Sequence, residues 1–253
     1  FPVNRISGGS FVFEDRTYTF PINEPQTGCH LHGEIHNKIF DVENVSEDSV
    51  TMSLTVLPTA GFMHKYRISI TYSLCEKGLI HKTEVVNLSD MNMPCLLGFH
   101  TTFNLPFVED SEGVIRVLAD VGDEIERDKN YLPTGRILRT DEIGEKIGNG
   151  TFDPRSVPIS RHYPAKASGR IELYDTAKNI RIIYNNDSSF KYRLFYNGNA
   201  DKYICLEPQN CMVNSPNSPF GREASGFEFL PPNSSKTFKS EILIKKEEIK
   251  VKE

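Results

Sequence analysis

The stretch Tyr66–Tyr72 reads Tyr-Arg-Ile-Ser-Ile-Thr-Tyr and alternates apolar or aromatic side chains with polar ones. Because successive side chains of an extended chain point to opposite faces, this alternation predicts a β-strand with one buried face. The stretch Val50–Val56 alternates in the same way, and Lys236–Ile244 can place its apolar side chains on one face. We therefore expect strands in all three places.

Short clusters of turn-forming residues separate the predicted strands, for example Ser46–Asp48 and Glu76–Gly78. Strands of roughly five to nine residues recur, and no segment keeps a helical period for more than about three turns. This pattern indicates an all-β fold with few short helices rather than alternating strands and helices. We predict a large antiparallel β-sandwich, with a barrel as the alternative.

The stretch Gly122–Pro158 is the least regular part of the sequence and is rich in Gly, Asp, Glu and Pro. We expect long connections here, with one short helical turn near Asp141–Lys146. Long loops inside a compact domain often carry function.

Length, composition and charge limit the possible classes of protein. The 253 residues show no repeat and no shift in composition, which favours a single domain over residues 1–253. The net charge is −5 and the positive residues are spread along the chain, which argues against nucleic acid or an anionic membrane as a partner. No apolar run reaches the roughly 18 residues of a membrane span, and no signal peptide is visible.

Five cysteines occur at irregular spacing and without a Cys-x-x-Cys pair. An odd number with irregular spacing makes a disulfide framework and a structural zinc site unexpected. Reduced thiols are the simplest account, and they indicate a cytoplasmic protein.

A glutamate ends an otherwise apolar strand, since Tyr203–Gln209 reads Tyr-Ile-Cys-Leu-Glu-Pro-Gln. Cys205 and Glu207 would share one face of this strand, and neither face is clearly exposed to water. Loss of hydration raises the pKa of a carboxyl group unless a partner compensates, and a carboxyl tuned towards neutrality suits proton transfer. Glu207 is therefore the first candidate catalytic residue.

The stretch Leu96–Leu105 combines an apolar face with a small polar face. As a strand, it would direct its bulky apolar side chains to the core and place Gly98, His100, Thr102 and Asn104 on the other face. An imidazole and an amide with little bulk around them leave room for a polar ligand, and a histidine suits acid and base work near neutrality. A half-exposed strand with a solvated histidine is the alternative.

The stretch His30–His36 reads His-Leu-His-Gly-Glu-Ile-His. Alternation would put three histidines and Glu34 on one face, and such spacing occurs in metal sites. The central glycine interrupts the strand pattern, so a single functional histidine beside a turn is the competing interpretation, and we predict no metal. The other histidines, His64, His81 and His162, are scattered and are interpreted as structural or solvated.

Arg5 stands before the pair Gly8–Gly9 and offers a rigid set of donors for hydroxyl or carboxylate groups. Taken alone, it would be interpreted as a surface arginine at a turn. The Pro-rich stretch Asn214–Gly221 follows Glu207 and indicates a loop near the same site.

Five segments, four of them discussed above, occur in the order found in the aldose 1-epimerase (galactose mutarotase) family, and the sequence resembles that family over essentially its whole length. The segments are Asn4–Gly9, Leu31–Gly33, Phe99–Leu105, Tyr203–Gln209 and Gly226–Pro232. They resemble the motifs N-R-I-x-x-G, L-H-G, H-x-x-F-N-L, C-x-E-P and G-x-x-x-L-x-P-G, although Asn233 stands where the last motif ends in Gly. The resemblance implies the galactose mutarotase-like supersandwich, a form of β-sandwich.

The resemblance also implies an activity: an aldose 1-epimerase, an isomerase of carbohydrate metabolism, interconverts the α and β anomers of a hexose without a cofactor. Glu207 would be the general base for the anomeric hydroxyl, and His100 the general acid for the ring oxygen. The partner would be a small sugar, bound by a monomer or a homodimer. The implied substrate-binding residues are His32, Arg5, Asn104 and His162.

Two departures from the family pattern matter. Better-studied members carry an Asp-His pair in the second half, whereas Arg161 precedes His162 here, so the sugar preference is open. The family also has several strands before the N-R-I motif, so the sandwich would lack strands unless residues precede Phe1. Three alternatives stay open: a non-catalytic carbohydrate-binding or sensing module, a hexose-phosphate mutarotase that uses Arg161 and Arg222, and a metal-dependent enzyme.

Overall fold

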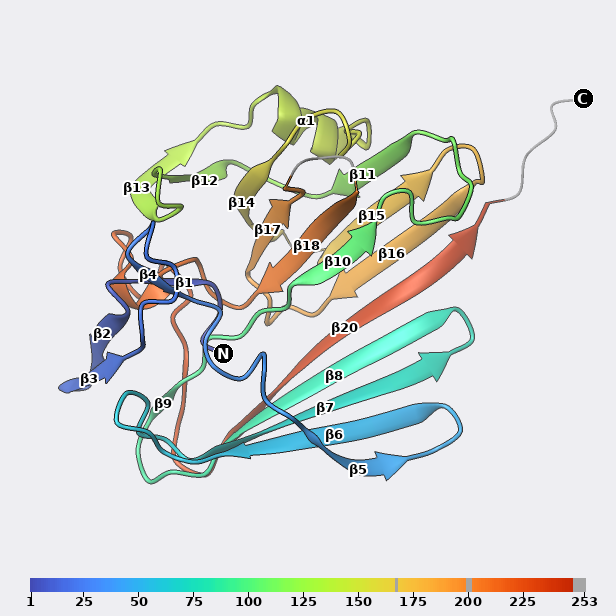
Figure 1. Ribbon diagram of the computed structural model, residues 1–253. Helices are drawn as coiled ribbons and strands as arrows, with labels where there is room; N and C mark the ends of the chain where they lie inside the picture. Colours follow the sequence, from blue (N-terminus) through green and yellow to red (C-terminus); the bar gives the residue numbers. More distant parts are fainter. Residues whose placement is uncertain (167, 199–201, 248–253) are drawn as a thin grey trace, which may run out of the picture.

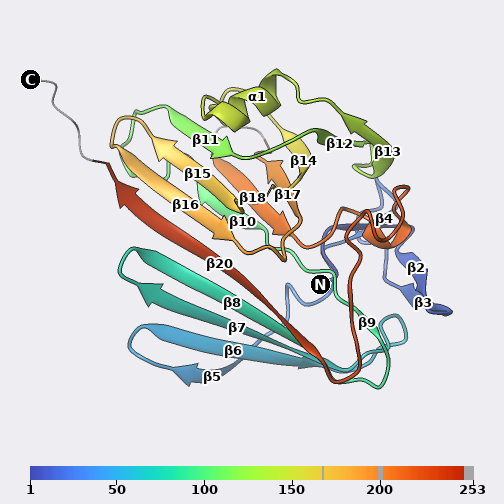
Figure 2. The same cartoon turned by 180° about the vertical axis from the view of Figure 1, so that it is seen from behind.

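Two antiparallel β-sheets form most of the protein (Figures 1 and 2). The computed structural model describes residues 1–166, 168–198 and 202–247. The larger sheet has the spatial order β11 (Ile115–Ala119), β15 (Arg170–Asp175), β16 (Ile180–Asn186), β20 (Ser235–Lys246), β8 (Gly78–Asn87), β7 (Tyr66–Cys75), β6 (Ser49–Val56) and β5 (Asp41–Val45). The smaller sheet has the order β10 (Thr101–Asn104), β18 (Tyr203–Gln209), β17 (Tyr192–Tyr196) and β14 (Ser160–Pro164). The prediction of an all-β antiparallel sandwich is confirmed.

The three strands predicted from alternation are present as β6, β7 and β20. In β7 the side chains of Tyr66 and Ile68 are buried, whereas Arg67 and Ser69, which alternate with them, are partly exposed. The period-two pattern thus reports the buried face at the start of this strand, because the pleat sends alternate side chains to opposite sides.

The smaller sheet packs on the end of the larger sheet formed by β11, β15 and β16 (Figure 1). Side chains from the inner faces of both sheets make a dry core between them, which holds the two layers together through the hydrophobic effect. The buried side chains of this core include Val117, Ile171 and Leu173 from the larger sheet and Phe195, Ile204 and Leu206 from the smaller one.

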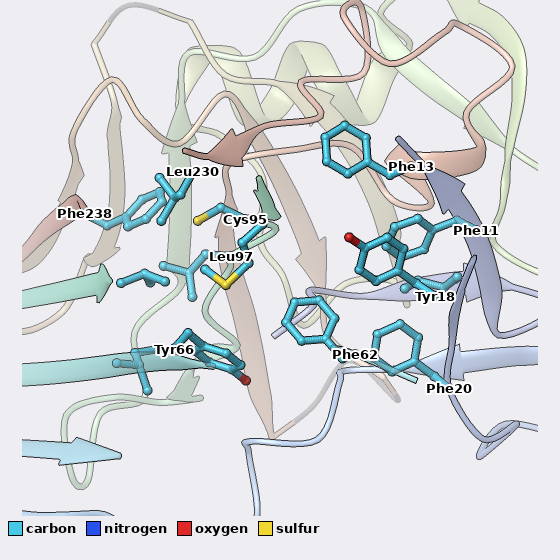
Figure 3. Packing of buried hydrophobic residues seen from close by; sticks show 14 of the residues in the cluster. Phe11, Phe13, Tyr18, Phe20, Phe62, Tyr66, Cys95, Leu97, Leu230 and Phe238 are labelled. Carbon is cyan, nitrogen blue, oxygen red and sulfur yellow. The ribbon is translucent and has the colours of Figure 1, made fainter. Parts of the chain in front are cut away.

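A second core is rich in aromatic rings and joins the N-terminal segment to the larger sheet (Figure 3). Within the hairpin of β2 (Ser10–Phe13) and β3 (Arg16–Thr19), the rings of Phe11 and Tyr18 stack with centroids 4.7 Å apart. Phe62 packs against Tyr18, with ring centroids 5.7 Å apart. Buried aromatic rings contribute much of the apolar area in a core, so this cluster fixes the N-terminal segment in place.

Short elements link the two sheets or pack beside them. They are β1 (Arg5–Ser7) paired with β4 (Cys29–Leu31), β9 (Met93–Pro94) paired with β19 (Phe229–Leu230), β12 (Glu124–Arg127) paired with β13 (Pro133–Leu138), the helix α1 (Glu142–Asn149) and the 3-10 turn η1 (Ser215–Asn217). The prediction of few short helices is confirmed for the described residues.

The expectation of long irregular connections across Gly122–Pro158 is wrong in part. The stretch contains the hairpin of β12 and β13 and the two-turn helix α1, whose N-terminus is capped by the side chain of Asp141. The hairpin carries little sequence signal because most of its side chains are polar on both faces. It is anchored instead by Ile125, which is completely buried and packs in a small cluster with Tyr192 and Met212.

All five cysteines are free thiols, in agreement with the predicted absence of a disulfide framework. Within the described ranges, no helix is long and apolar enough to cross a lipid bilayer.

Candidate active site

A cleft of about 430 Å³ lies at the end of β18, where the smaller sheet meets the N-terminal segment and the β12–β13 hairpin. Its walls therefore come from parts of the chain that are far apart in sequence. The polar and aromatic side chains that line it include Arg5, Glu24, His32, His100, Arg127, Tyr131 and Glu207.

The register between β10 and β18 brings Glu207 and His100 together. Thr101 pairs with Leu206, so the residue before β10 lies beside Glu207 on the polar face. His100 Nε2 and Glu207 Oε1 are 3.3 Å apart. The side chain of Glu207 is 4% exposed and that of His100 is 45% exposed, so one group is dry while the other opens to the cleft.

Burial raises the pKa of Glu207 to about 8, and the predicted direction of this shift is confirmed. The amide of Gln209, which donates to Glu207 Oε2 over 3.3 Å, and the charges of Arg127 and Arg5 act in the opposite direction but do not cancel the loss of hydration. Burial lowers the pKa of His100 below its usual 6.5. The two environments therefore reverse the usual order in which a glutamate and a histidine lose their protons.

His32 stands at a turn just after β4, with a positive φ of 67°. A left-handed backbone is rare for a residue with a side chain, and here it occurs in a residue that lines the cleft. The ring of His32 meets that of His100 edge-on, with centroids 5.3 Å apart. Burial is the main reason, and the charge of the nearby His100 the second, why the pKa of His32 is lowered to about 4. The His32 ring is therefore neutral, so one of its nitrogens can donate a hydrogen bond and the other can accept one.

Arg5 and Glu24 form a bidentate ion pair at the outer part of the cleft. Arg5 Nε and Nη2 each donate to a Glu24 oxygen over 2.7 Å, and this contact is the main reason why the pKa of Glu24 is lowered. The backbone of Arg5 is held by the Pro-rich stretch, since the amide of Asn214 donates to the Arg5 carbonyl over 3.0 Å. The prediction that the Pro-rich stretch lies near the same site agrees with this contact.

The β12–β13 hairpin supplies two cleft residues that sequence reasoning missed. Arg127 donates through Nη2 to the Ser160 carbonyl over 2.6 Å, whereas its buried Nη1 has no partner within the described residues. The ring of Tyr131 lies under the Arg5 guanidinium, 4.6 Å from its central carbon. Tyr131 also has a positive φ of 63°, which is unusual for a bulky residue. The turn-like run Asp128-Lys129-Asn130 between two short segments was the signal available for this hairpin.

The structure does not bring Asn104 or His162 into the lining of this cleft. Asn104 is exposed at the far end of β10. His162 is completely buried in β14, where its Nε2 accepts a 3.4 Å hydrogen bond from the Val213 amide, so the interpretation as a structural histidine describes it better.

The two arginines considered for phosphate recognition also lie outside the cleft lining. Arg161 forms ion pairs with Glu124 and Asp141, so its charge is already compensated. Arg222 donates to the Val12 carbonyl and stacks on the Phe227 ring.

The alternating metal set proposed for His30–His36 does not form. β4 ends at Leu31, and the side chain of His30 is buried with its Nδ1 2.7 Å from the Pro21 carbonyl. The glycine-bounded turn separates the later residues from this strand, as the competing interpretation expected. Within the described residues, the donor atoms that could hold a metal together belong to His100, Cys205 and Glu207.

Comparisons with known proteins identify the family and the fold of this chain. The family model for aldose 1-epimerase matches residues 1–242. A galactose mutarotase-like protein from Clostridium acetobutylicum has 34% sequence identity and a TM-score of 0.89, with 98% of this chain and 78% of that chain covered. An aldose epimerase homologue from C. elegans shares the fold, with a TM-score of 0.80, 17% identity, and 96% of this chain and 80% of that chain covered.

The curated relatives match over shorter segments. Protein LacX from Lactococcus lactis subsp. lactis is 32% identical over 83 residues, which is 31% of this chain and 27% of that protein. The uncharacterized protein YihR from Escherichia coli is 26% identical over 110 residues, covering 42% of this chain and 36% of that protein. The matched segments thus span little more than a third of these relatives at most.

Proposed function

Because the chain belongs to the aldose 1-epimerase family, we propose that it interconverts the α and β anomers of a hexose in the cleft beside β18. The observation that carries the proposal is the buried carboxyl of Glu207 beside the imidazole of His100, with 3.3 Å between Oε1 and Nε2. Anomer exchange needs one acid and one base on neighbouring oxygens, and this pair can supply both from one position.

The proposed reaction opens and closes the sugar ring. Glu207 takes the proton from the anomeric hydroxyl while His100 gives a proton to the ring oxygen, so the bond between C1 and the ring oxygen breaks and an aldehyde forms. Rotation about C1–C2 turns the other carbonyl face towards the ring oxygen. The two residues then return the protons in the reverse direction, and the other anomer is released.

The pKa values support this role because the reaction needs the pair to hold one proton in total. With ordinary values, a glutamate and a histidine would together hold less than half a proton above about pH 6.5, so the acid would be lost progressively as the pH rises through neutrality. Burial raises the pKa of Glu207 to about 8, which extends the one-proton state through neutral pH. Because Glu207 loses its proton at a higher pH than His100, this proton rests on Glu207 in the free cleft. It must move across the 3.3 Å to His100 before Glu207 can act as the base and His100 as the acid.

The remaining cleft residues have binding roles in this proposal. His32 is neutral and lies edge-on to His100, so it can hydrogen-bond near the ring oxygen. Arg5 and Arg127 offer donors for sugar hydroxyls, and Glu24 is an acceptor. Glu24 thus provides an acidic group in the cleft, although Arg161 stands where the sequence comparison led us to look for one.

We propose a free hexose rather than a phosphate ester. The two arginines considered for phosphate, Arg161 and Arg222, lie outside the cleft lining and already have partners. Anomer exchange measured on glucose 6-phosphate and on glucose separates the two substrates, and a clear preference for the phosphate would contradict this assignment.

The test of the activity is polarimetry on freshly dissolved α-glucose and α-galactose. Glu207→Gln keeps the shape of the side chain but removes the base, so we expect the enzymatic rate to fall about 10²- to 10⁴-fold. Glu43→Gln is the matched control, because Glu43 lies on the exposed strand β5, where it pairs with Arg67 of β7. An unchanged rate in Glu207→Gln would remove Glu207 from the mechanism. Sugar binding by calorimetry without any accelerated exchange would favour the non-catalytic binding module.

A further inference from the structure

Cys205 is a thiol beside the catalytic pair that the proposed reaction does not use. It precedes Glu207 by two residues on β18, so both side chains lie on the same face. Its cross-strand partner is Thr102, whose hydroxyl lies 3.4 Å from the Cys205 sulfur. His100 precedes Thr102 by two residues, so the sheet places His100, Glu207 and Cys205 at neighbouring positions.

The donor atoms of these three side chains are close enough to share one ion. His100 nitrogen, Cys205 sulfur and a Glu207 oxygen all lie within 4.8 Å of one another. Around a tetrahedral zinc ion with bonds of about 2.0–2.3 Å, neighbouring donors lie roughly 3.3–3.7 Å apart, so the contact between His100 and Glu207 already fits. The Cys205 sulfur lies no more than 4.8 Å from the other two donors, so a movement of about one ångström brings it to the spacing that zinc requires.

The chemistry of the donor set selects the kind of cation. Thiolate and imidazole ligands favour Zn²⁺ and similar transition metals, whereas Mg²⁺ and Ca²⁺ prefer all-oxygen sites. The Cys205 side chain is buried, but His100 and Glu207 both line the cleft, so an ion can arrive from the sugar side. A water molecule or a sugar hydroxyl can complete the coordination there.

We propose that His100, Cys205 and Glu207 bind a thiophilic divalent cation such as Zn²⁺, and that this cation switches off the active site. Coordination uses the lone pair of His100 and the carboxylate of Glu207, so neither group can then move a proton. When the metal binds, Cys205 releases its thiol proton and the Glu207–His100 pair releases the one proton that it holds, both to solvent. The inhibition rests on the proposed function, whereas the metal site itself does not.

The first experiment measures binding without any assay of activity. Co²⁺ is titrated into the wild-type protein, and we expect one site per chain with an intense near-ultraviolet band from thiolate coordination. Cys205→Ser should lose this band and bind Zn²⁺ at least about tenfold more weakly in competition with a chromophoric chelator, because a soft ligand is lost. Cys75→Ser removes the exposed thiol and should change neither result.

The second experiment measures inhibition of anomer exchange. Micromolar Zn²⁺ should slow the wild-type enzyme, a chelator should restore the rate, and Mg²⁺ should have no effect. Cys205→Ser should keep most of the metal-free rate and need at least about tenfold more Zn²⁺ for half inhibition. The proposal is overturned if wild type with Co²⁺ shows no thiolate band, or if Cys205→Ser is as sensitive to Zn²⁺ as Cys75→Ser. A protein without anomer exchange would refute the proposed function, while the cobalt spectrum would still decide the metal site.

Discussion

Glu207 and Glu24 line the same cleft and are both largely buried, with side chains 4% and 11% exposed, yet their acid–base properties are opposite. The pKa of Glu207 is raised to about 8 by burial, whereas that of Glu24 is lowered, chiefly by its hydrogen bonds from Arg5. Burial alone therefore does not decide the protonation of a carboxyl group in this cleft.

The difference comes from the depth of burial and from the partners, because Glu24 lies nearer the surface and loses less hydration than Glu207. Glu24 accepts two 2.7 Å hydrogen bonds from a guanidinium, which stabilise the charged form. Glu207 accepts a longer bond from the neutral amide of Gln209, and no lysine or arginine in the described part of the chain donates to it. A carboxyl group with a charged partner is suited to holding a ligand, and one without such a partner is suited to exchanging protons.

The largest expected effect tests whether Glu207 and His100 act as a unit. His100→Asn should lower the rate of anomer exchange about 10²- to 10⁴-fold, because it removes the acid. The double variant with Glu207→Gln should be little slower than the slower single variant, since each loss already disables the pair. Polarimetry measures all three, and His36→Asn on the exposed turn is the control. Multiplicative losses would show that the two residues act independently.

The second prediction uses stability, where the two glutamates should respond to pH in opposite directions. Glu207 keeps its proton in the folded state up to about pH 8 but loses it near pH 4.5 when unfolded, so wild-type stability falls between these values. Glu207→Gln avoids this loss, and its advantage should grow by about 2–4 kcal/mol from pH 4.5 to pH 8.5.

Glu24 has a lowered pKa, so its contribution to stability is present above pH 4.5 and is lost as the pH falls through the folded-state value. Glu24→Gln should therefore be most destabilised relative to wild type at high pH and least at low pH. Chemical denaturation at several pH values measures both variants. Parallel pH dependences for the two would contradict the contrast between the glutamates.

The pH–rate profile should report the catalytic pair and not Glu24. Above about pH 8, the pair holds no proton and no acid remains, so kcat/KM should fall about tenfold per pH unit. The lower limit should lie below pH 6.5, since burial lowers the pKa of His100. Arg127→Met removes a charge that lowers the pKa of Glu207, so the upper limit should move to higher pH. An upper limit that stays in place would exclude this influence.

The smallest effect is expected at the rim of the cleft. Tyr131→Ala removes the ring under Arg5, and the loss of a contact worth about 0.5–1 kcal/mol should raise KM a few fold with little change in kcat. Tyr174→Ala is the matched control, because its ring lies 4.0 Å from the Arg181 guanidinium on the larger sheet. Sugar titrations that give equal KM values for both variants would exclude Tyr131 from binding.

Much of the inner site could be predicted because it lies on strands. The alternation around Glu207 and His100 specifies which side chains share a face, and the structure places both in the cleft. His32 and Arg5 were also predicted and line the same cleft, through the resemblance rather than through any periodicity. Asn104 shows the limit, since it shares the face of His100 but lies farther along the strand and outside the cleft lining.

The outer site could not be predicted, because its members come from segments without a strong period. The β12–β13 hairpin is polar on both faces and depends on the burial of Ile125 against Tyr192 and Met212. Arg127 and Tyr131 belong to this hairpin, so its packing carries them to the cleft. Arg161 stands where the family pattern has an acid, and its charge pairs with Glu124 and Asp141 away from the cleft lining.

The sequence by itself determined that strands dominate, that Glu207 lies in a buried strand, and that His100 lies on a polar face, because these properties follow from a repeat of two residues along an extended chain. Only the tertiary structure decided that Arg5 donates to Glu24 while no lysine or arginine of the described residues donates to Glu207, and that a hairpin lies at the rim. Those outcomes depend on distances between segments far apart in sequence, and the free energy of a charge changes steeply with such distances.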